Sequence, residues 1–235
     1  MLVLAVHGSA VPEAAETIGR LAARLEQTTG VRPVVGHLDV QRPSLGEVLA
    51  ERPGAVVMPV LLGDGYHRKV DIPAVARAYD CTVTEGLSGE RDVTLAVHAR
   101  LREAEAPLGG WADAIVVAGA GSTRPGGNDG TLAVVDDLRD LRDVPVVPAY
   151  CSAAEPTVPE AVARLRAAGH RRVAVAAHLL APGRFTRALA ECGAWAVSEP
   201  VADHPRIARL VADRYRAADE RWAAEGEHAG SDSSL

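Results

Sequence analysis

The sequence contains one pattern twice, and this internal repeat is the strongest constraint on its fold. The shared turn residues stand 113 positions apart: Gly8 and Gly121, Ser9 and Ser122, Pro12 and Pro125, Pro43 and Pro156. Near the end of each copy, Val93 and Val97 correspond to Ile207 and Val211. A repeat of this length indicates two copies of one folding unit.

Each copy alternates short apolar runs with segments of helical periodicity. In the first copy we expect strands over 2–6, 33–40, 55–62 and 81–84, and helices over 12–30, 43–50, 71–79 and 91–106. In the second we expect strands over 113–118, 145–150, 172–180 and 195–197, and helices over 132–141, 156–168, 183–191 and 204–217. Strands that alternate with helices predict parallel sheets covered on both faces.

The predicted fold is therefore α/β, with two tandem pseudo-symmetric, doubly wound parallel-sheet domains and a cleft between them. Pro107-Leu108-Gly109-Gly110 interrupts the pattern and is placed as a linker. We expect one domain over residues 1–107 and a second over 111–222. The small, polar residues 223–235 are expected to form a mobile tail.

Charge and hydropathy exclude several classes of protein. The net charge of -6 argues against nucleic acid as a partner. No apolar run approaches the roughly 20 residues that span a bilayer, and Met1 runs directly into the first strand without a basic leader. We expect no membrane association and a cytoplasmic location. The three cysteines lack metal-binding spacing and are interpreted as small apolar residues.

Three polar residues follow three different strands of the first copy: His7, Asp39 and His67. Ligand sites in open α/β sheets lie just past the carboxyl ends of the strands, so these side chains can converge. Two neutral imidazoles and a carboxylate suit a divalent first-row metal ion. The second copy has Ala120, Ser152 and Phe185 at the equivalent positions. We therefore expect the first half to carry the reactive groups and the second half to close the cleft.

Other polar residues support weaker interpretations. Gly8-Ser9 could bind a phosphate at a helix N-terminus, but the chain has no Gly-x-Gly-x-x-Gly motif and no Walker lysine. We expect no nucleotide. His178 lies inside an apolar run and is interpreted as a core histidine whose hydrogen bonds are satisfied.

The motifs resemble a known family. The segments His7-Gly8-Ser9, Leu38-Asp39 with Pro43-Ser44-Leu45, and Gly65-Tyr66-His67 with Asp71-Ile72-Pro73 are similar to those of the sirohydrochlorin chelatases, the class II chelatases of sirohaem and cobalamin synthesis. The resemblance extends over about residues 1–222. The family commonly has Glu where this chain has Asp39, and Arg where it has Ala10.

The resemblance implies a lyase that inserts Co²⁺ or Fe²⁺ into the tetrapyrrole sirohydrochlorin. Nickel also suits imidazole ligands, so the sequence does not choose among the three metals. By this resemblance His7 and His67 bind the metal and accept pyrrole protons, and Asp39 assists. The expected macrocycle contacts are Gly8, Ser9, Gly65, Tyr66 and Arg124, the last supplied across the cleft in place of the missing family arginine.

The substrate implied by the resemblance carries eight carboxylates, so a negatively charged protein needs local cations to bind it. The candidates near predicted strand ends or helix starts are Arg42, Arg68, Lys69, Arg124, Arg184 and Arg187. Two other functions stay open: a non-catalytic metal or tetrapyrrole carrier, and an enzyme that acts on another anionic substrate with the histidines as acid and base and without metal. We expect a monomer or a homodimer, and the sequence does not choose between them.

Overall fold

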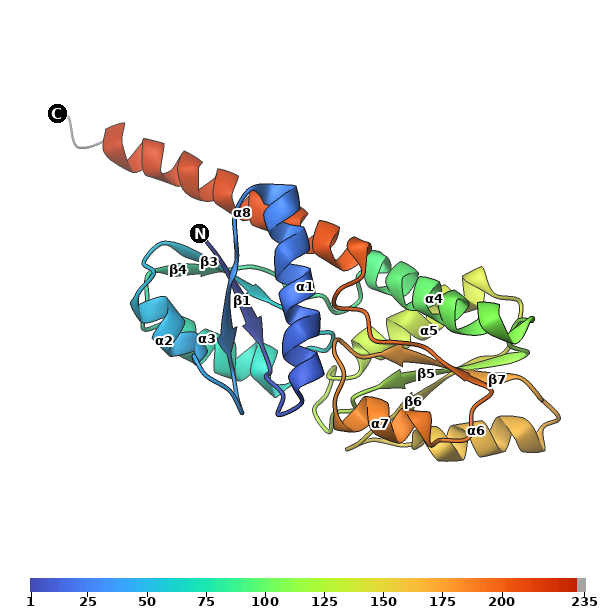
Figure 1. Cartoon of the computed structure of the whole chain (residues 1–235). Coiled ribbons are helices and arrows are strands. Elements are labelled where there is room, and N and C mark those ends of the chain that lie inside the picture. Colours follow the sequence, from blue (N-terminus) through green and yellow to red (C-terminus); the bar gives the residue numbers. More distant parts are fainter. Residues whose placement is uncertain (232–235) are drawn as a thin grey trace.

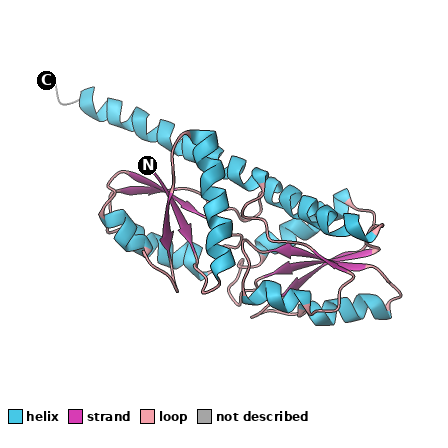
Figure 2. Ribbon diagram, in the orientation of Figure 1, coloured by secondary structure: helices cyan, strands magenta, loops and turns pink. Residues whose placement is uncertain are grey.

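The chain forms two parallel four-stranded sheets, one from each copy of the repeat (Figures 1 and 2). The structure is a computed structural model that describes the backbone of residues 1–231 and the side chains of residues 1–221. The strand orders are β2-β1-β3-β4 and β6-β5-β7-β8, so the two sheets have the same topology. The expected α/β fold with two tandem parallel-sheet units is confirmed.

The first sheet contains β1 (Leu2–Val6), β2 (Val34–His37), β3 (Ala55–Pro59) and β4 (Cys81–Val83). Its helices are α1 (Pro12–Thr29), α2 (Leu45–Ala50), α3 (Ile72–Ala76) and α4 (Arg91–Glu105), with a π-helix (His67–Asp71) before α3 and a 3₁₀ turn (Ala106–Leu108) after α4. The central strands β1 and β3 are buried along their whole length, as expected for a parallel sheet covered on both faces.

The second sheet contains β5 (Ala114–Gly119), β6 (Val146–Tyr150), β7 (Val173–His178) and β8 (Ala196–Val197). Its helices in chain order are α5 (Asp129–Leu141), α6 (Val158–Ala167), α7 (Arg184–Ala190) and α8 (Pro205–Ser231). Helix α8 continues well past its expected end at residue 217. The mobility of residues 223–235 stays a prediction, and residues 232–235 lie outside the described residues.

Local signals in the sequence account for several helix boundaries. Pro12 begins α1 and Gly30, with a left-handed φ of 72°, ends it. Ser44 and Glu47 form a capping box at the start of α2, and Thr157 and Glu160 form the equivalent box at α6. The two halves thus share their caps as well as their strand order.

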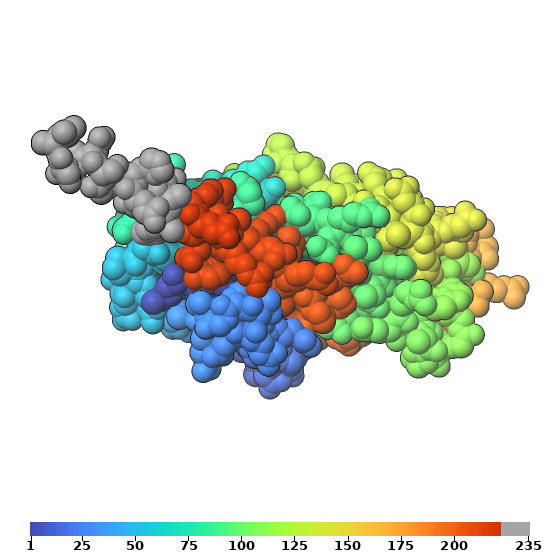
Figure 3. Space-filling model, turned by 90° about the horizontal axis from the view of Figure 1, so that it is seen from above, coloured from blue at the N-terminus to red at the C-terminus, as the bar shows by residue number. Residues whose placement is uncertain are grey.

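The last helix of each half packs on the other half. Helix α4 lies on α5 and on strands β7 and β8 of the second sheet, and α8 lies on α1 and on β3 of the first. Viewed from above, α8 lies between the blue residues of α1 and the green residues of the α4 region (Figure 3). Val93 and Val97 of α4 and Ile207 and Val211 of α8 are fully or almost fully buried in one continuous core. The division at residues 107–111 stays a prediction, because each sheet takes one covering helix from across that boundary.

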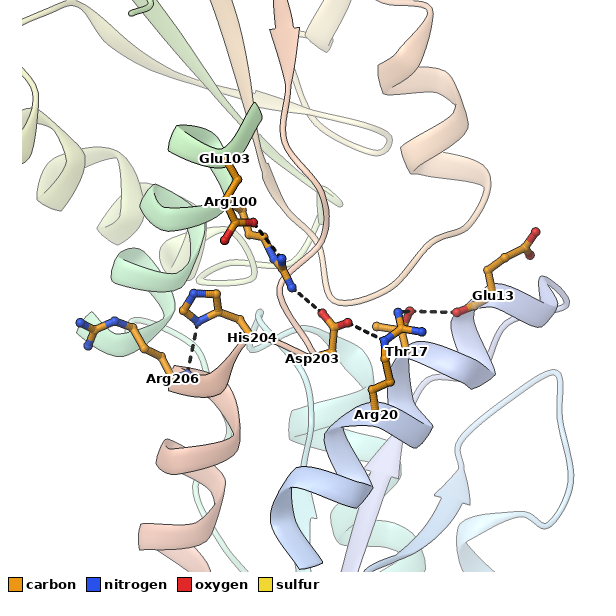
Figure 4. Close-up of polar contacts among 8 residues, drawn as sticks. All are labelled: Glu13, Thr17, Arg20, Arg100, Glu103, Asp203, His204 and Arg206. Atoms are coloured by element: carbon orange, nitrogen blue, oxygen red, sulfur yellow. Dashed lines mark hydrogen bonds and ion pairs between the residues drawn. The ribbon is translucent and has the colours of Figure 1, made fainter. Parts of the chain in front are cut away.

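An ion-pair network joins the exchanged helices (Figure 4). Asp203, just before α8, accepts hydrogen bonds from Arg20 of α1 at 2.7 Å and from Arg100 of α4 at 2.7 Å. Burial alone would raise the pKa of Asp203, but the two arginines outweigh it and lower the pKa below its ordinary value of 3.8. The carboxylate therefore stabilises the contact between the halves while it is ionised.

Within the described residues, no helix combines the length and the apolar character needed to cross a membrane.

Replacing Asp203 with Asn should destabilise the protein at pH 7 by about 1–3 kcal/mol, because two arginines lose a charged acceptor. A group with a lowered folded pKa contributes stability above its unfolded pKa, so the difference should vanish as the pH falls below the folded value. Urea unfolding at pH 7 and at a series of lower pH values measures both. Asp213→Asn, which removes an exposed pair with Arg216, is the matched control and should cost less than about 1 kcal/mol. Equal stability of Asp203→Asn and the wild type at pH 7 would contradict this account.

Candidate active site

The carboxyl ends of the two sheets meet at a cleft between the halves. The cavity encloses about 430 Å³, which is within the range of ligand pockets. Its first-half wall includes His7, His67 and the turn from Leu61 to Gly65, and its second-half wall includes Ala120–Ser122, His178 and Phe185. Residues from both copies of the repeat therefore surround one space.

The repeat relates the two walls by pseudo-twofold symmetry. A Cβ built on Gly65 would lie 3.8 Å from Oγ of Ser122, and one built on Gly183 would lie 3.8 Å from Oγ of Ser9. Gly65 and Gly183 are equivalent in the repeat, as are Ser9 and Ser122. The small residues thus allow each half to approach the turn of the other.

His7 and His67 lie beside each other in this cleft. Their ring centroids are 4.6 Å apart and the rings are inclined by 40°. His7 directly follows β1, and His67 begins the π-helix after β3. The sequence placed His67 in a loop before a helix at Asp71, so its helical position is a correction: the turn at Gly63–Gly65 is shorter than expected and the chain turns helical four residues earlier. Single π-helical turns often occur at functional sites.

Asp71 orients His67. Its Oδ2 lies 2.6 Å from Nδ1 of His67, within the same π-helical turn. Because an ionised carboxylate can only accept, Nδ1 carries the hydrogen and Nε2 keeps its lone pair when the ring is neutral. A carboxylate behind a histidine in this way fixes the tautomer of metal-binding imidazoles. The sequence placed Asp71 at a helix start and in the family motif but gave it no role of its own, although its i, i+4 spacing from His67 was a usable signal.

His7 is held in a form that can donate a lone pair. Desolvation and then the neighbouring His67 lower the pKa of His7 below its ordinary value of 6.5, although Asp39 opposes them. Part of the residue remains exposed in the cleft. At pH 7 the ring is therefore neutral and able to bind a metal ion or accept a proton.

A backbone hydrogen bond joins the turn after β1 to the turn after β2. The backbone N–H of Asp39 donates to the carbonyl of His7 at 3.0 Å. The next residue, Gly8, has a φ of +97°, and a Cβ there would collide with the carbonyl oxygen of Asp39, so only glycine fits. Ser9 donates its backbone N–H to Oε1 of Gln41 at 2.9 Å. Gly8 and Ser9 thus fix the position of His7.

Asp39 lies close to His7 but its carboxylate closes its own turn. Oδ1 accepts from the backbone N–H of Val40 at 2.7 Å, and Val40 has a left-handed φ of 65°. Among the described residues, no group of three His, Cys, Asp or Glu side chains is arranged to hold a metal ion. The histidine pair is therefore brought together without a third protein ligand, and the catalytic role of Asp39 stays a prediction.

Two predicted macrocycle contacts meet across the cleft. The guanidinium of Arg124, from the second half, lies 4.5 Å from the ring centre of Tyr66, from the first. Of the other candidate cations, Arg68 lines the cleft and also binds Glu85 at 3.0 Å. Arg42 instead pairs with Glu47, and Arg184 lies over Phe185 at 5.1 Å. Arg68 therefore lines the cavity itself, and Arg124 contacts Tyr66, which also lines it.

The cysteines do not provide a thiolate site. All three are unpaired and partly buried. Burial raises the pKa of Cys151 to about 11, with a further contribution from Cys192, so its thiol stays protonated at pH 7.

The comparisons with known proteins agree with the repeat and the fold. The model of the CbiX family matches the chain twice, over residues 1–104 and 114–218. The sirohydrochlorin cobaltochelatase of Methanococcus aeolicus is 32% identical over 88 residues, which are 34% of this chain and 60% of that protein. The chain therefore spans about three fifths of the length of this relative.

Two solved structures are similar over most of the chain. SirB from Bacillus subtilis with Fe³⁺ has a TM-score of 0.75 at 20% identity, covering 92% of this chain and 93% of that one. The sirohydrochlorin chelatase SirB from Bacillus subtilis subspecies spizizenii, in complex with cobalt, has a TM-score of 0.70 at 20% identity with the same coverage. At this identity the likeness establishes the fold. The double match of the family model establishes more: this chain belongs to the CbiX family of sirohydrochlorin chelatases, the class II chelatases.

Proposed function

We propose that this protein inserts a divalent metal ion, Co²⁺ or Fe²⁺, into sirohydrochlorin. The observation that carries the proposal is the adjacency of the His7 and His67 rings, 4.6 Å apart, in the cleft where the two sheets end. The similar proteins are a sirohydrochlorin cobaltochelatase, a sirohydrochlorin chelatase in complex with cobalt, and SirB with Fe³⁺. These descriptions support the same substrates for this protein.

The proposed reaction exchanges two protons for one metal ion. The metal ion is a substrate, held by Nε2 of His67 and by a ring nitrogen of His7. Two imidazoles leave most coordination positions open for the pyrrole nitrogens that replace water. As the macrocycle takes the metal ion, its two N–H protons leave. Once the metal ion has been transferred, the imidazoles are free to accept those protons, because neutral imidazole is a suitable base near pH 7.

The asymmetry between the walls supports a single metal site in the cleft. Ala120 and Phe185 replace the two histidines in the second half, and Phe185 lines the cleft opposite them. A flat macrocycle between the walls meets ligands on the first-half side and an apolar ring on the other. We infer that the second half positions the macrocycle and excludes water.

Substituting either histidine of the pair should abolish most of the activity. We expect His7→Ala and His67→Ala to lower kcat/KM at least about 100-fold, since each removes a ligand and a base. The assay follows the spectrum of free-base sirohydrochlorin with Co²⁺ or Fe²⁺ against the non-enzymatic rate. His170→Ala is the control, because His170 precedes β7 at the opposite end of the second sheet. Wild-type rates in both variants would contradict the site, and stoichiometric binding without turnover would indicate a carrier.

Asp71→Asn should weaken metal binding by orienting His67 less well. Loss of such a carboxylate typically costs about 10–100-fold in metal affinity, and we expect this decrease for Co²⁺ in calorimetric titrations without tetrapyrrole. Asp64→Asn, in the neighbouring turn, is the matched control and should leave the affinity unchanged. The proposed orienting role is wrong if both variants bind Co²⁺ equally well.

Arg124→Gln should raise KM for sirohydrochlorin by several-fold and change kcat little. The guanidinium would attract substrate carboxylates and keep Tyr66 in place. The cation–π contact with Tyr66 contributes about 1 kcal/mol. Arg171→Gln, an exposed residue before β7, serves as the control. Steady-state kinetics at saturating Co²⁺ measure the effect; a loss of kcat without a change in KM would contradict a binding role.

A further inference from the structure

A third histidine lies beside the pair, and the proposed reaction does not use it. His37 is the last residue of β2 and pairs in register with Val6, which directly precedes His7. Its Cδ2 would lie 3.6 Å from a Cβ built on Gly8, so the ring lies against the turn that positions His7. The first half therefore has an imidazole after each of its strands β1, β2 and β3.

The second half has no imidazole at the equivalent positions. Tyr150 ends β6 as His37 ends β2, and Ala120 and Phe185 are the counterparts of the histidine pair. The third imidazole is thus found in the half that has the pair and is absent from the half that lacks it. This distribution associates His37 with the same chemistry.

The backbone fixes which nitrogen of His37 is free to bind a ligand. Nδ1 lies 3.0 Å from the carbonyl oxygen of Pro43, which also accepts the backbone N–H of His37 at 3.0 Å. A carbonyl oxygen only accepts, so Nδ1 carries the hydrogen and Nε2 keeps its lone pair in the neutral ring. Metal-binding histidines almost always donate their second ring nitrogen in this way.

The lone pair on Nε2 is also accessible. In the described part of the chain, the buried side-chain atoms that lack a partner are Nε of Arg68 and Arg100 and Nε2 of His98 and His178. Nε2 of His37 has no hydrogen-bond partner among the described residues either, but it is not one of these buried atoms. It is therefore exposed to solvent and able to bind an incoming ion.

His37 and His67 both line a second cavity, which we call the acidic cavity and which encloses about 470 Å³. Its charged side chains are Asp39 and Asp71, and among the described residues no lysine or arginine lines it. A cavity with one sign of charge concentrates ions of the opposite sign. Its volume exceeds the roughly 180 Å³ that six water molecules occupy in the liquid, so a hydrated cation fits.

The cleft between the halves has the opposite character. Arg68 and Tyr66 line it, and Arg124 lies over the ring of Tyr66. His67 lines both the cleft and the acidic cavity. A metal ion that arrived through an occupied cleft would have to pass the macrocycle, whereas an ion in the acidic cavity reaches His67 without crossing it.

We propose that the acidic cavity is the entry site of the divalent metal ion, and that Nε2 of His37 is the first nitrogen to bind it. The inference rests on the proposed function. The ion then moves to the lone pairs of His7 and His67, and one water molecule leaves it for each nitrogen that binds. No group of three His, Cys, Asp or Glu side chains in the described residues is arranged to hold a metal ion, which suits a site that must release its ion.

The kinetic test uses His37→Phe, which keeps a flat ring and removes the lone pair. We expect KM for Co²⁺ to rise at least about 10-fold, because loss even of a group that only orients a ligand costs about 10–100-fold in metal affinity. The dissociation constant for metal-free sirohydrochlorin should not change. His170→Phe is the matched control and should leave both constants unchanged, since His170 precedes β7 at the opposite end of the second sheet.

A second variant guards against misfolding. His37→Gln keeps a hydrogen for the Pro43 carbonyl and should show the same rise in KM for Co²⁺, because imidazole suits this metal better than an amide oxygen does. Melting temperatures of both variants close to that of the wild type would show that the rise does not come from unfolding.

A spectroscopic test needs no tetrapyrrole and no activity. In the double variant His7→Ala/His67→Ala, Co²⁺ should still shift and broaden the imidazole ¹⁵N signals of His37. Adding His37→Phe to this variant should remove the signals that respond to Co²⁺, and those of His170 should stay unchanged throughout.

The outcomes separate this inference from the proposed function. If the wild type inserts Co²⁺ and both His37 variants keep the wild-type KM for Co²⁺, the entry site is wrong and the proposed function stands. A change in sirohydrochlorin binding instead of KM for Co²⁺ would also overturn it. If the wild type inserts no metal ion, the proposed function fails and the entry role fails with it, and the ¹⁵N titration then decides whether His37 binds a cation at all.

Discussion

The exchange of the last helix between the halves is the contact on which the rest of the structure depends. Each sheet is covered on one face by a helix from the other half, α4 on the second sheet and α8 on the first. A parallel sheet needs cover on both faces, so neither sheet is complete without the other half. This packing directs the carboxyl ends of both sheets toward one cleft. Asp203, Arg20 and Arg100 add a charged contact at the point where the two halves join.

Within that frame the site combines rigid backbone with unequal chemistry. The turns that position His7 and its counterpart Ala120 are the same: Asp39 N–H donates to the His7 carbonyl, and Ser152 N–H donates to the Ala120 carbonyl, both at 3.0 Å. Gly8 and Gly121 both have left-handed φ values. The repeat therefore keeps its backbone geometry where the side chains differ. This indicates that both walls of the cleft depend on the same turn geometry.

Much of the fold could be predicted because its signals are local. The apolar runs of β1 and β3, Pro12 and Gly30 around α1, and the capping residues of α2 and α6 each act within a few residues. The spacing of the repeat then predicted the shared topology. The helix exchange could not be predicted, because α4 presents the same apolar face whichever sheet it covers. Its buried residues Val93 and Val97 carry no information about their partner.

The site was predictable to a similar depth. The positions of His7 and His67 after neighbouring strands predicted that they meet, and their rings are adjacent. The orientation of each side chain depends on distances that the spacing of residues in the sequence does not give. The carboxylate of Asp39 accepts a hydrogen bond from the backbone of Val40, whereas that of Asp71, which was placed at a helix start, pairs with His67. His178 was recognised as buried, but the expectation that its hydrogen bonds are satisfied is wrong: Nε2 has no partner among the described residues, and this depends on packing that the sequence does not reveal.

The pseudo-twofold approach of Gly65 to Ser122 and of Gly183 to Ser9 has an evolutionary consequence. A protein with a single copy of the repeat would reach the same architecture as a dimer that swaps its terminal helix, and its cleft would hold two identical sets of histidines. The proposed reaction needs one metal ion, so one set is redundant for it. Joining the copies in one chain allows each to vary separately, and this chain has Ala120 and Phe185 where the second set would stand.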